Sequence, residues 1–214
     1  MLDLDGLESV NVIAADSRRG GVETQSVNNV NIFDNHQLVD VSLPGLTNLA
    51  SLSINENDAL QTIAMANLAG LAELFEIRNN PQLTSISCPQ FEDSGVLFAL
   101  RRNGELSTAD FPLLANVGGS NLRGSNRGDF RLEELGLVTL DGFPALEHVA
   151  GSIQVTDNNE LTSVSGLAAL DTVGEELNIS NNPVLPTCDV QALVDALSSF
   201  DDANIHGNLE DECS

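Results

Sequence analysis

The side chains that most often do chemistry are few in this chain and lie far apart. The histidines occur singly, at His36, His148 and His206, and form neither an HxxxH nor an HExxH pair, so no zinc site is indicated. Acidic neighbours such as Glu133–Glu134 point apart on an extended chain and make poor acid–base pairs. GxSxG and P-loop motifs are absent from the sequence. We therefore expect a protein that is not an enzyme and holds no cofactor, with Ca²⁺ left open because turns such as DNNE supply oxygen ligands.

Basic residues are rare, and all eight are arginines. The 32 acidic residues give a formal net charge of −24, which makes nucleic acid a poor partner. A Gly-rich segment at 118–128, GGSNLRGSNRG, adds about nine residues to the repeat described below. Insertions in repeat proteins form loops that often bind ligands. We expect ligand-binding residues in and near this loop: Arg123, Asn126, Arg127, Arg131, Arg101 and Arg102.

Two other interpretations of these arginines stay open. They would neutralise acids on the protein's own surface, or they would dock on the acidic face of a neighbouring copy in an assembly. The same choice applies to the net charge, which either attracts a cationic partner or only keeps the surface solvated.

An asparagine recurs through the chain at a nearly constant interval. The phrase apolar-x-x-Asn-x-x-Leu-x-x-apolar occurs in five segments, including INENDALQTI at 54–63, and LRRNGELSTA at 100–109 keeps its Asn and Leu. The interval is 22–24 residues, apart from one gap of 55 that holds a degenerate repeat and the insertion. A buried Asn can satisfy backbone groups at a tight corner, and Asn tolerates the left-handed conformation. We expect a structural ladder, in preference to a ligand-binding row, at Asn35, Asn57, Asn80, Asn103, Asn158 and Asn182.

A short pair of alternating apolar residues, such as Leu52/Ile54, precedes each asparagine and indicates a short strand with one face inward. Such a strand can bury that face only by stacking on the next repeat. The sequence therefore predicts a mainly β, right-handed parallel β-solenoid of about eight coils in one domain, 1–214. Its parts are an N-terminal coil or cap at 1–29, with a coil starting at Val10/Val12, repeats at 30–188 and a C-terminal cap at 189–214.

The repeat phrases resemble a known family. The stretch from Gly166 to Leu185 reads G-L-x-x-L…V-G-x-L-x-I-x-x-N-P-x-L, which resembles the receptor L-domain family and its leucine-rich-repeat-like relatives. The ending NNPVLPTCDVQALVDAL resembles the last coil and cap of bacterial lipoprotein-type members in particular. The resemblance implies an extracellular solenoid used for recognition or surface structure, and it carries over no catalytic residue. The repeat departs from the family's pattern at 11–29 and 118–132.

The last segment changes period. Val190, Leu193, Val194 and Leu197 follow the spacing of one helix face, so we predict a helix that covers the open end of the sheet. Cys188 and Cys213 bracket this cap and would join it by a disulfide, with two free thiols as the alternative. We expect Cys88, the third cysteine, to be a small core or corner residue and not a nucleophile.

These expectations lead to one functional hypothesis and one alternative. The first is a non-enzymatic recognition module, secreted or at the cell surface, that binds a protein or glycan. The alternative is a structural protein that assembles with copies of itself in an envelope or filament. No apolar run approaches the roughly 20 residues of a membrane span.

Overall fold

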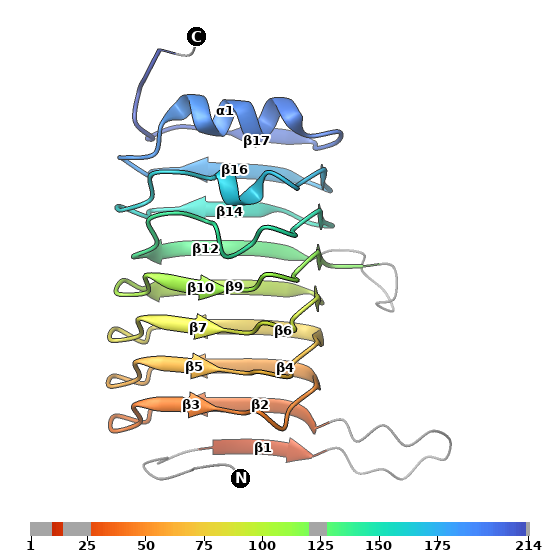
Figure 1. Ribbon diagram of the computed structural model, residues 1–214, viewed down its shortest axis with the longest axis vertical. Helices are drawn as coiled ribbons and strands as arrows, with labels where there is room; N and C mark the ends of the chain where they lie inside the picture. The colour runs from red at the N-terminus through yellow and green to blue at the C-terminus, as the bar shows by residue number, and fades with distance from the viewer. Residues whose placement is uncertain (1–9, 15–26, 120–127, 213–214) are drawn as a thin grey trace.

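The computed structural model describes residues 10–14, 27–119 and 128–212. The chain winds into a stack of about seven turns that rises from the N-terminus to the C-terminus (Figure 1). The predicted parallel β-solenoid is confirmed, with one α-helix at its C-terminal end. Its outline is regular because each repeat adds one similar turn on the last.

The widest face of the stack, here the main face, carries a strand from each turn. Neighbouring strands are parallel and in register, so that Leu52 lies beside Phe75 and Phe75 beside Phe98. The period-2 pattern holds, since alternate side chains such as Leu52 and Ile54 are fully buried. The strands are β2 (Val27–Phe33), β4 (Asn48–Asn55), β6 (Gly70–Arg78), β9 (Leu97–Asn103), β12 (Asp129–Leu135), β14 (Ile153–Thr156), β16 (Glu176–Ser180) and β17 (Asp202–Asn204).

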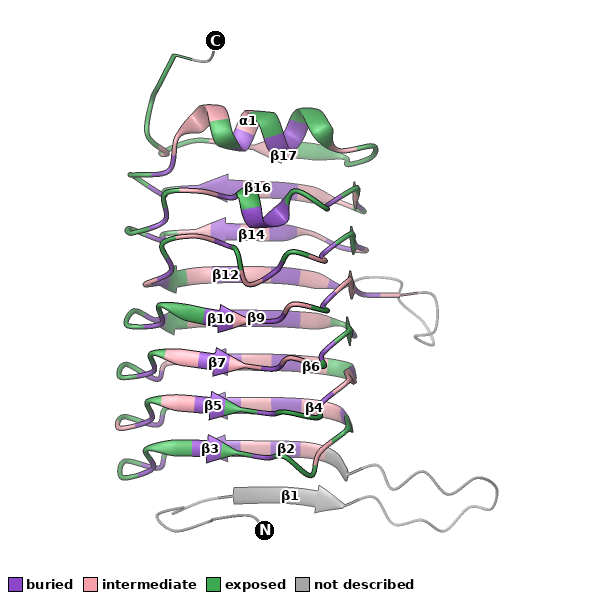
Figure 2. Cartoon of the chain, viewed as in Figure 1, coloured by how far each residue is buried: buried purple, intermediate pink, exposed green. Residues whose placement is uncertain are grey.

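Two narrower faces complete each turn. Two-residue strands extend the same 13-stranded sheet around the corner at which the main strands begin: β8 (Asp93–Ser94), β11 (Asn116–Val117), β13 (His148–Val149) and β15 (Thr172–Val173). A separate four-stranded parallel sheet is made by β3 (Asp40–Ser42), β5 (Thr62–Ala64), β7 (Ser85–Ser87) and β10 (Thr108–Asp110). Above it lies a 3₁₀ turn, Ser165–Leu167. A single hydrophobic core runs between the faces, as the buried segments of every turn show (Figure 2).

Phenylalanine fills the middle of this core, although the sequence contains few aromatic residues. Phe75, Phe98 and Phe130 stack in three successive turns, with ring centroids 4.9 and 5.2 Å apart. Phe111 and Phe143 form a second stack with a centroid distance of 5.4 Å. The middle turns thus use equivalent positions of the repeat to stack aromatic rings.

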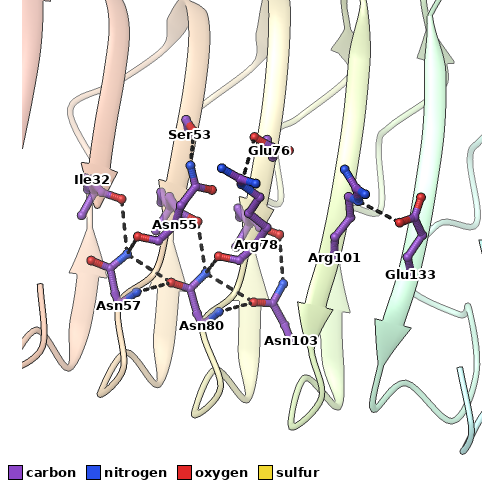
Figure 3. Close-up of polar contacts among 12 residues, drawn as sticks. Ile32, Ser53, Asn55, Asn57, Glu76, Arg78, Asn80, Arg101, Asn103 and Glu133 are labelled. Atoms are coloured by element: carbon purple, nitrogen blue, oxygen red, sulfur yellow. Dashed lines mark hydrogen bonds and ion pairs between the residues drawn. The ribbon is translucent and has the colours of Figure 1, made fainter. Parts of the chain in front are cut away.

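All six predicted asparagines are buried at the corner where the main strands end. Figure 3 shows three of them, Asn57, Asn80 and Asn103, in one file. The backbone N–H and the Nδ2 of Asn57 both donate to Oδ1 of Asn80, each at 3.1 Å. Asn80 repeats this pattern toward Asn103, at 3.0 and 3.3 Å. Its Nδ2 also donates to the carbonyl of Ile54 in the preceding turn, at 3.1 Å. Each side chain of this Asn ladder thus ties together the backbones of neighbouring turns.

The left-handed residue of each corner is the one before the ladder position. We had expected the asparagine itself to use this conformation, but none of the six ladder residues has a positive φ. A turn with one left-handed residue leaves the next side chain pointing inward, where it can hydrogen bond. The φ angles are between 53° and 60° at seven successive corners: Asp34, Glu56, Asn79, Arg102, Glu134, Asp157 and Asn181.

The Asn ladder has one interruption and one additional member. Leu135 takes the ladder position in the degenerate repeat, and its backbone N–H donates to Oδ1 of Asn158 at 3.0 Å. Asn208 continues the file above Asn182, whose backbone N–H donates to Oδ1 of Asn208 at 3.1 Å. Gly207 supplies the positive φ before it, at 66°.

The two ends of the stack differ from its repeated turns. At the N-terminal end, β1 (Val10–Ala14) pairs antiparallel with β2, so it is not the further parallel coil that we had expected to start at Val10/Val12. The stack therefore has about seven turns and not eight. At the other end lies the predicted helix, α1 (Thr187–Ala196), which packs Val190, Leu193 and Val194 into the core. Within the described residues, no helix is long and apolar enough to cross a membrane.

Candidate ligand-binding groove

The predicted loop leaves and re-enters the stack at one point. It connects β11 to β12, and Gly118 and Gly128 form its base. A Cβ atom added to Gly128 would lie 2.2 Å from the backbone nitrogen of Gly118, so only glycine allows this contact. The predicted ligand-binding residues Arg123, Asn126 and Arg127 lie outside the described residues.

A groove of about 810 Å³ runs beside the base of this loop, over the two-residue strands. Its polar side chains occupy equivalent positions in successive turns, because Asn116 pairs with Asp93 below it and His148 above it, and His148 with Thr172. Neighbours are hydrogen bonded in pairs: Asn116 Nδ2 donates to Asp93 Oδ1 at 2.8 Å, and His148 Nδ1 lies 2.9 Å from Thr172 Oγ1. The groove thus presents a carboxylate, an amide, an imidazole and a hydroxyl at intervals of about 4.8 Å. We call these four residues the polar file.

The floor of the groove is backbone, which explains its depth. Gly95 and Gly174 line it together with the loop base. A Cβ at Gly95 would lie 2.1 Å from the carbonyl oxygen of Ala72, and one at Gly174 would lie 2.1 Å from that of Ala150. Side chains larger than hydrogen would therefore force the turns apart at this corner.

Two of the predicted arginines, Arg101 and Arg131, lie on the main face and are paired with acids of the same chain. Arg101 Nε is 2.8 Å from Glu133 Oε2 in the next turn, and Arg131 Nη2 is 2.7 Å from Asp129 Oδ2. Figure 3 shows Arg101 reaching across from β9 to Glu133 on β12. These contacts agree with the interpretation in which the arginines neutralise the protein's own acids.

Arg102 is the third arginine of the predicted set that the structure describes. It lies at the left-handed corner, away from the polar file. Its Nε is 3.1 Å from Glu134 Oε1, and both side chains are exposed. It borders a second, more open groove of about 780 Å³ around the ladder interruption at Leu135, which Asp157 and Glu160 also line. The described members of the predicted set are therefore divided between two surfaces and do not converge on one site.

Cys88 and the acidic and histidine side chains were the remaining candidates for a reactive thiol or a metal cluster. Cys88 is fully buried, and burial raises the pKa of its thiol far above the usual range, with the negative charge of Asp110 adding to the effect. The prediction that Cys88 is a core residue is confirmed. Among the described residues, no group of three or more His, Cys, Asp or Glu is arranged to hold a metal ion.

The turns that we had considered for Ca²⁺ use their asparagines for the Asn ladder. Asn35, Asn57 and Asn158, which come from DNHQ, ENDA and DNNE, are buried. The Oδ1 atoms of Asn57 and Asn158 accept backbone N–H groups of the neighbouring turn at 3.1 and 3.0 Å. These amide oxygens therefore face the interior and do not point toward solvent.

The chain was compared with models of known protein families and with the curated proteins, and neither comparison finds a match. The resemblance to receptor L-domains therefore depends on the repeat residues alone.

Sequence reasoning missed both the polar file and the last ladder residue. The polar file does have a repeated signal, because each of its four residues directly precedes a buried residue. The intervals between the four are irregular, from 23 to 32 residues, and conceal the pattern. The signal for Asn208 is clearer, because Ile205-His206-Gly207-Asn208 repeats the apolar-x-x-Asn phrase.

Proposed function

We propose that this chain is a non-enzymatic recognition module that binds a protein or glycan, and that the polar file with the adjoining loop is its binding site. The observation that carries the proposal is the groove itself. Its size is in the usual range for ligand sites, roughly 300–1,000 Å³, and it offers several hydrogen-bonding groups on a rigid backbone floor.

A neutral glycan is the ligand class that fits the groove best. Amide, imidazole and hydroxyl groups can each pair with sugar hydroxyls, and their regular interval suits an extended chain. A net charge of −24 disfavours anionic polymers at long range. The setting that we propose is secreted or cell-surface, where an oxidising environment would allow the predicted Cys188–Cys213 disulfide. Cys213 lies outside the described residues, and this disulfide stays a prediction.

The alternative hypothesis, a filament formed by stacking copies end to end, has less support. A parallel stack grows by adding parallel strands at its edges, and here the outermost N-terminal strand, β1, is antiparallel while the helix α1 covers the other end. Copies would have to meet by their sides.

The test of the proposal is a binding screen against an array of neutral glycans, followed by variants. Because Gly118 and Gly128 are as close as bonded neighbours, residues 119–127 can be deleted and the two glycines joined directly. We expect this deletion, and separately Thr172→Ala in the polar file, to weaken binding at least tenfold. Thr108→Ala, an exposed threonine on the opposite sheet, is the matched control and should bind as the parent does. Binding that survives both the deletion and Thr172→Ala would show that the ligand site lies elsewhere.

A further inference from the structure

The main face differs in charge from the rest of the molecule. Its two central outward rows carry charged side chains on β6, β9 and β12 only, three arginines and two glutamates. These two rows have a formal charge of +1, on a chain whose total is −24. Their other residues are uncharged: Asn31, Phe33, Ser53, Asn55, Ala99, Gln154, Thr156, Asn178, Ser180 and Asn204, of which Ala99 and Ser180 are buried. The third outward row carries Asp129, Glu176 and Asp202, which brings the formal charge of the three rows to −2.

The charges of this face form a checkerboard. Glu76 and Arg78 lie two residues apart on β6, and Arg131 and Glu133 occupy the equivalent positions on β12. The four positions mark a rectangle of roughly 7 by 10 Å, from the spacing of residues and strands in a sheet. Each corner has an opposite charge at both adjacent corners and a like charge only across the diagonal. Arg101 lies on β9, between Arg78 and Glu133.

Such a pattern is complementary to itself. A two-fold axis parallel to the sheet can place a second copy face to face with the first. Each corner of the rectangle in one copy then lies opposite a neighbouring corner of the rectangle in the other copy, and these two corners have opposite charges. With the axis along the stack, Glu76 faces the Arg78 of the other copy, and Arg101 faces an uncharged alanine, Ala99. With the axis along the strands, Arg101 would face itself, so the side-by-side parallel arrangement is favoured.

The arginines of the rectangle have donors to spare. A guanidinium group carries five N–H donors. Within the described residues, the buried Nε atoms of Arg78 and Arg131 make no hydrogen bond. Arg78 Nε is 3.6 Å from Glu76 Oε2, which is an ion pair but too long for a hydrogen bond. These buried Nε atoms are closed to a facing copy, so a second carboxylate would bind the Nη groups of Arg78, whose side chain is 40% exposed.

We propose that this checkerboard face, made by Glu76, Arg78, Arg101, Arg131 and Glu133, is a contact surface for a second copy of this chain. The flat area spans the eight main strands and three outward rows, roughly 34 by 13 Å from sheet spacings. That is about half of the roughly 800 Å² per partner in a standard interface, so the pairing is weak and reversible. The proposal is independent of the groove, which lies around the corner of the stack from these two rows.

Sedimentation velocity of the full chain, from about 10 µM to 500 µM in 0.15 M salt, tests the proposal, because charges beyond about 8 Å are screened in that salt. Arg78→Glu/Arg131→Glu makes all four corners negative, and Glu76→Arg/Glu133→Arg makes all four positive. Combining all four changes swaps the sign of each corner and restores the checkerboard of the rectangle, while Arg101 keeps its positive charge, so this variant is the matched control.

We expect the wild-type chain to dimerise at the higher concentrations, and each double variant to associate at least tenfold more weakly. An equimolar mixture of the two double variants should form a heterodimer tighter than the wild-type dimer, which also shows that both variants are folded. The quadruple variant should associate within about threefold of the wild type. A wild-type chain that stays monomeric throughout, or double variants that each dimerise as the wild type does, overturns the proposal.

Discussion

Replacing Asn80 with alanine removes a side chain that serves three turns of the stack at once. Its Oδ1 accepts two hydrogen bonds from Asn57, both at 3.1 Å. Its Nδ2 donates to the carbonyls of Ile54 and Arg78 at 3.1 and 3.0 Å, and lies 3.3 Å from Asn103 Oδ1. Since Asn80 is fully buried, water cannot replace these partners without opening the corner.

The loss of unfolding free energy depends on which hydrogen-bonding groups keep another partner after the substitution and which do not. Asn57 Nδ2 retains two carbonyl acceptors, and the Arg78 carbonyl retains the backbone N–H of Glu56. The backbone N–H of Asn57 and the carbonyl of Ile54 lose the Asn80 partner. A buried group left unsatisfied costs about 1–3 kcal/mol, so the free energy of unfolding should fall by about 4 kcal/mol. That is a large share of the roughly 5–15 kcal/mol that stabilises a typical domain.

Equilibrium urea unfolding, followed by circular dichroism, measures this change. Asn159→Ala is the matched control, because Asn159 is exposed at an equivalent corner and its replacement should alter the free energy of unfolding by less than about 0.5 kcal/mol. A loss below about 1 kcal/mol for Asn80→Ala, with an unchanged m-value, would refute the idea that the Asn ladder is a main source of stability.

Three further predictions concern the ladder interruption, the groove floor and the cysteines. Leu135→Asn should lower the free energy of unfolding by at least 2 kcal/mol less than Leu132→Asn does. The reason is that a ladder position offers hydrogen-bond partners to the new amide and a core position does not; equal losses in urea unfolding would contradict this. Gly95→Ala should lower the melting temperature by several degrees, whereas Gly104→Ala, where an added Cβ meets nothing within 4 Å, should not; similar melting curves would remove the close contact from the account. A thiol reagent should label no cysteine in the native chain and Cys88 alone when the chain is unfolded in urea. It should label all three cysteines when the chain is unfolded and reduced. Labelling of two further thiols in urea without reductant would exclude the predicted disulfide of the C-terminal cap.

The fold was accessible from the sequence because one pattern specifies it repeatedly. The interval of the asparagines and the alternating pairs such as Leu52/Ile54 predicted the parallel register that the structure has. The degenerate repeat that the gap of 55 predicted is also present, since Phe130 lies beside Phe98 in the neighbouring turn. The antiparallel pairing of the first strand was not accessible, because Val10 and Val12 show the same alternation that a parallel strand would.

The candidate site was harder to predict because no single motif encodes it. Its polar file is assembled from residues of four turns, and each of them alone reads as an ordinary surface residue. The arginines stand out in an acidic sequence, yet Arg101 and Arg131 contact acids that their sequence positions do not identify as partners. Which side chains share a face depends on strand register, and register becomes known only when the turns are stacked.

Hydrogen exchange measured by NMR tests the central claim, that the asparagines join the turns in one continuous file. The claim predicts that the backbone N–H and the Nδ2 protons of Asn57, Asn80 and Asn158 exchange only with opening of the stack and are among the slowest in the protein. The exposed Asn67 and Asn159 should exchange within the first measurement. Ladder protons that exchange as fast as those of Asn67 and Asn159 would contradict the claim.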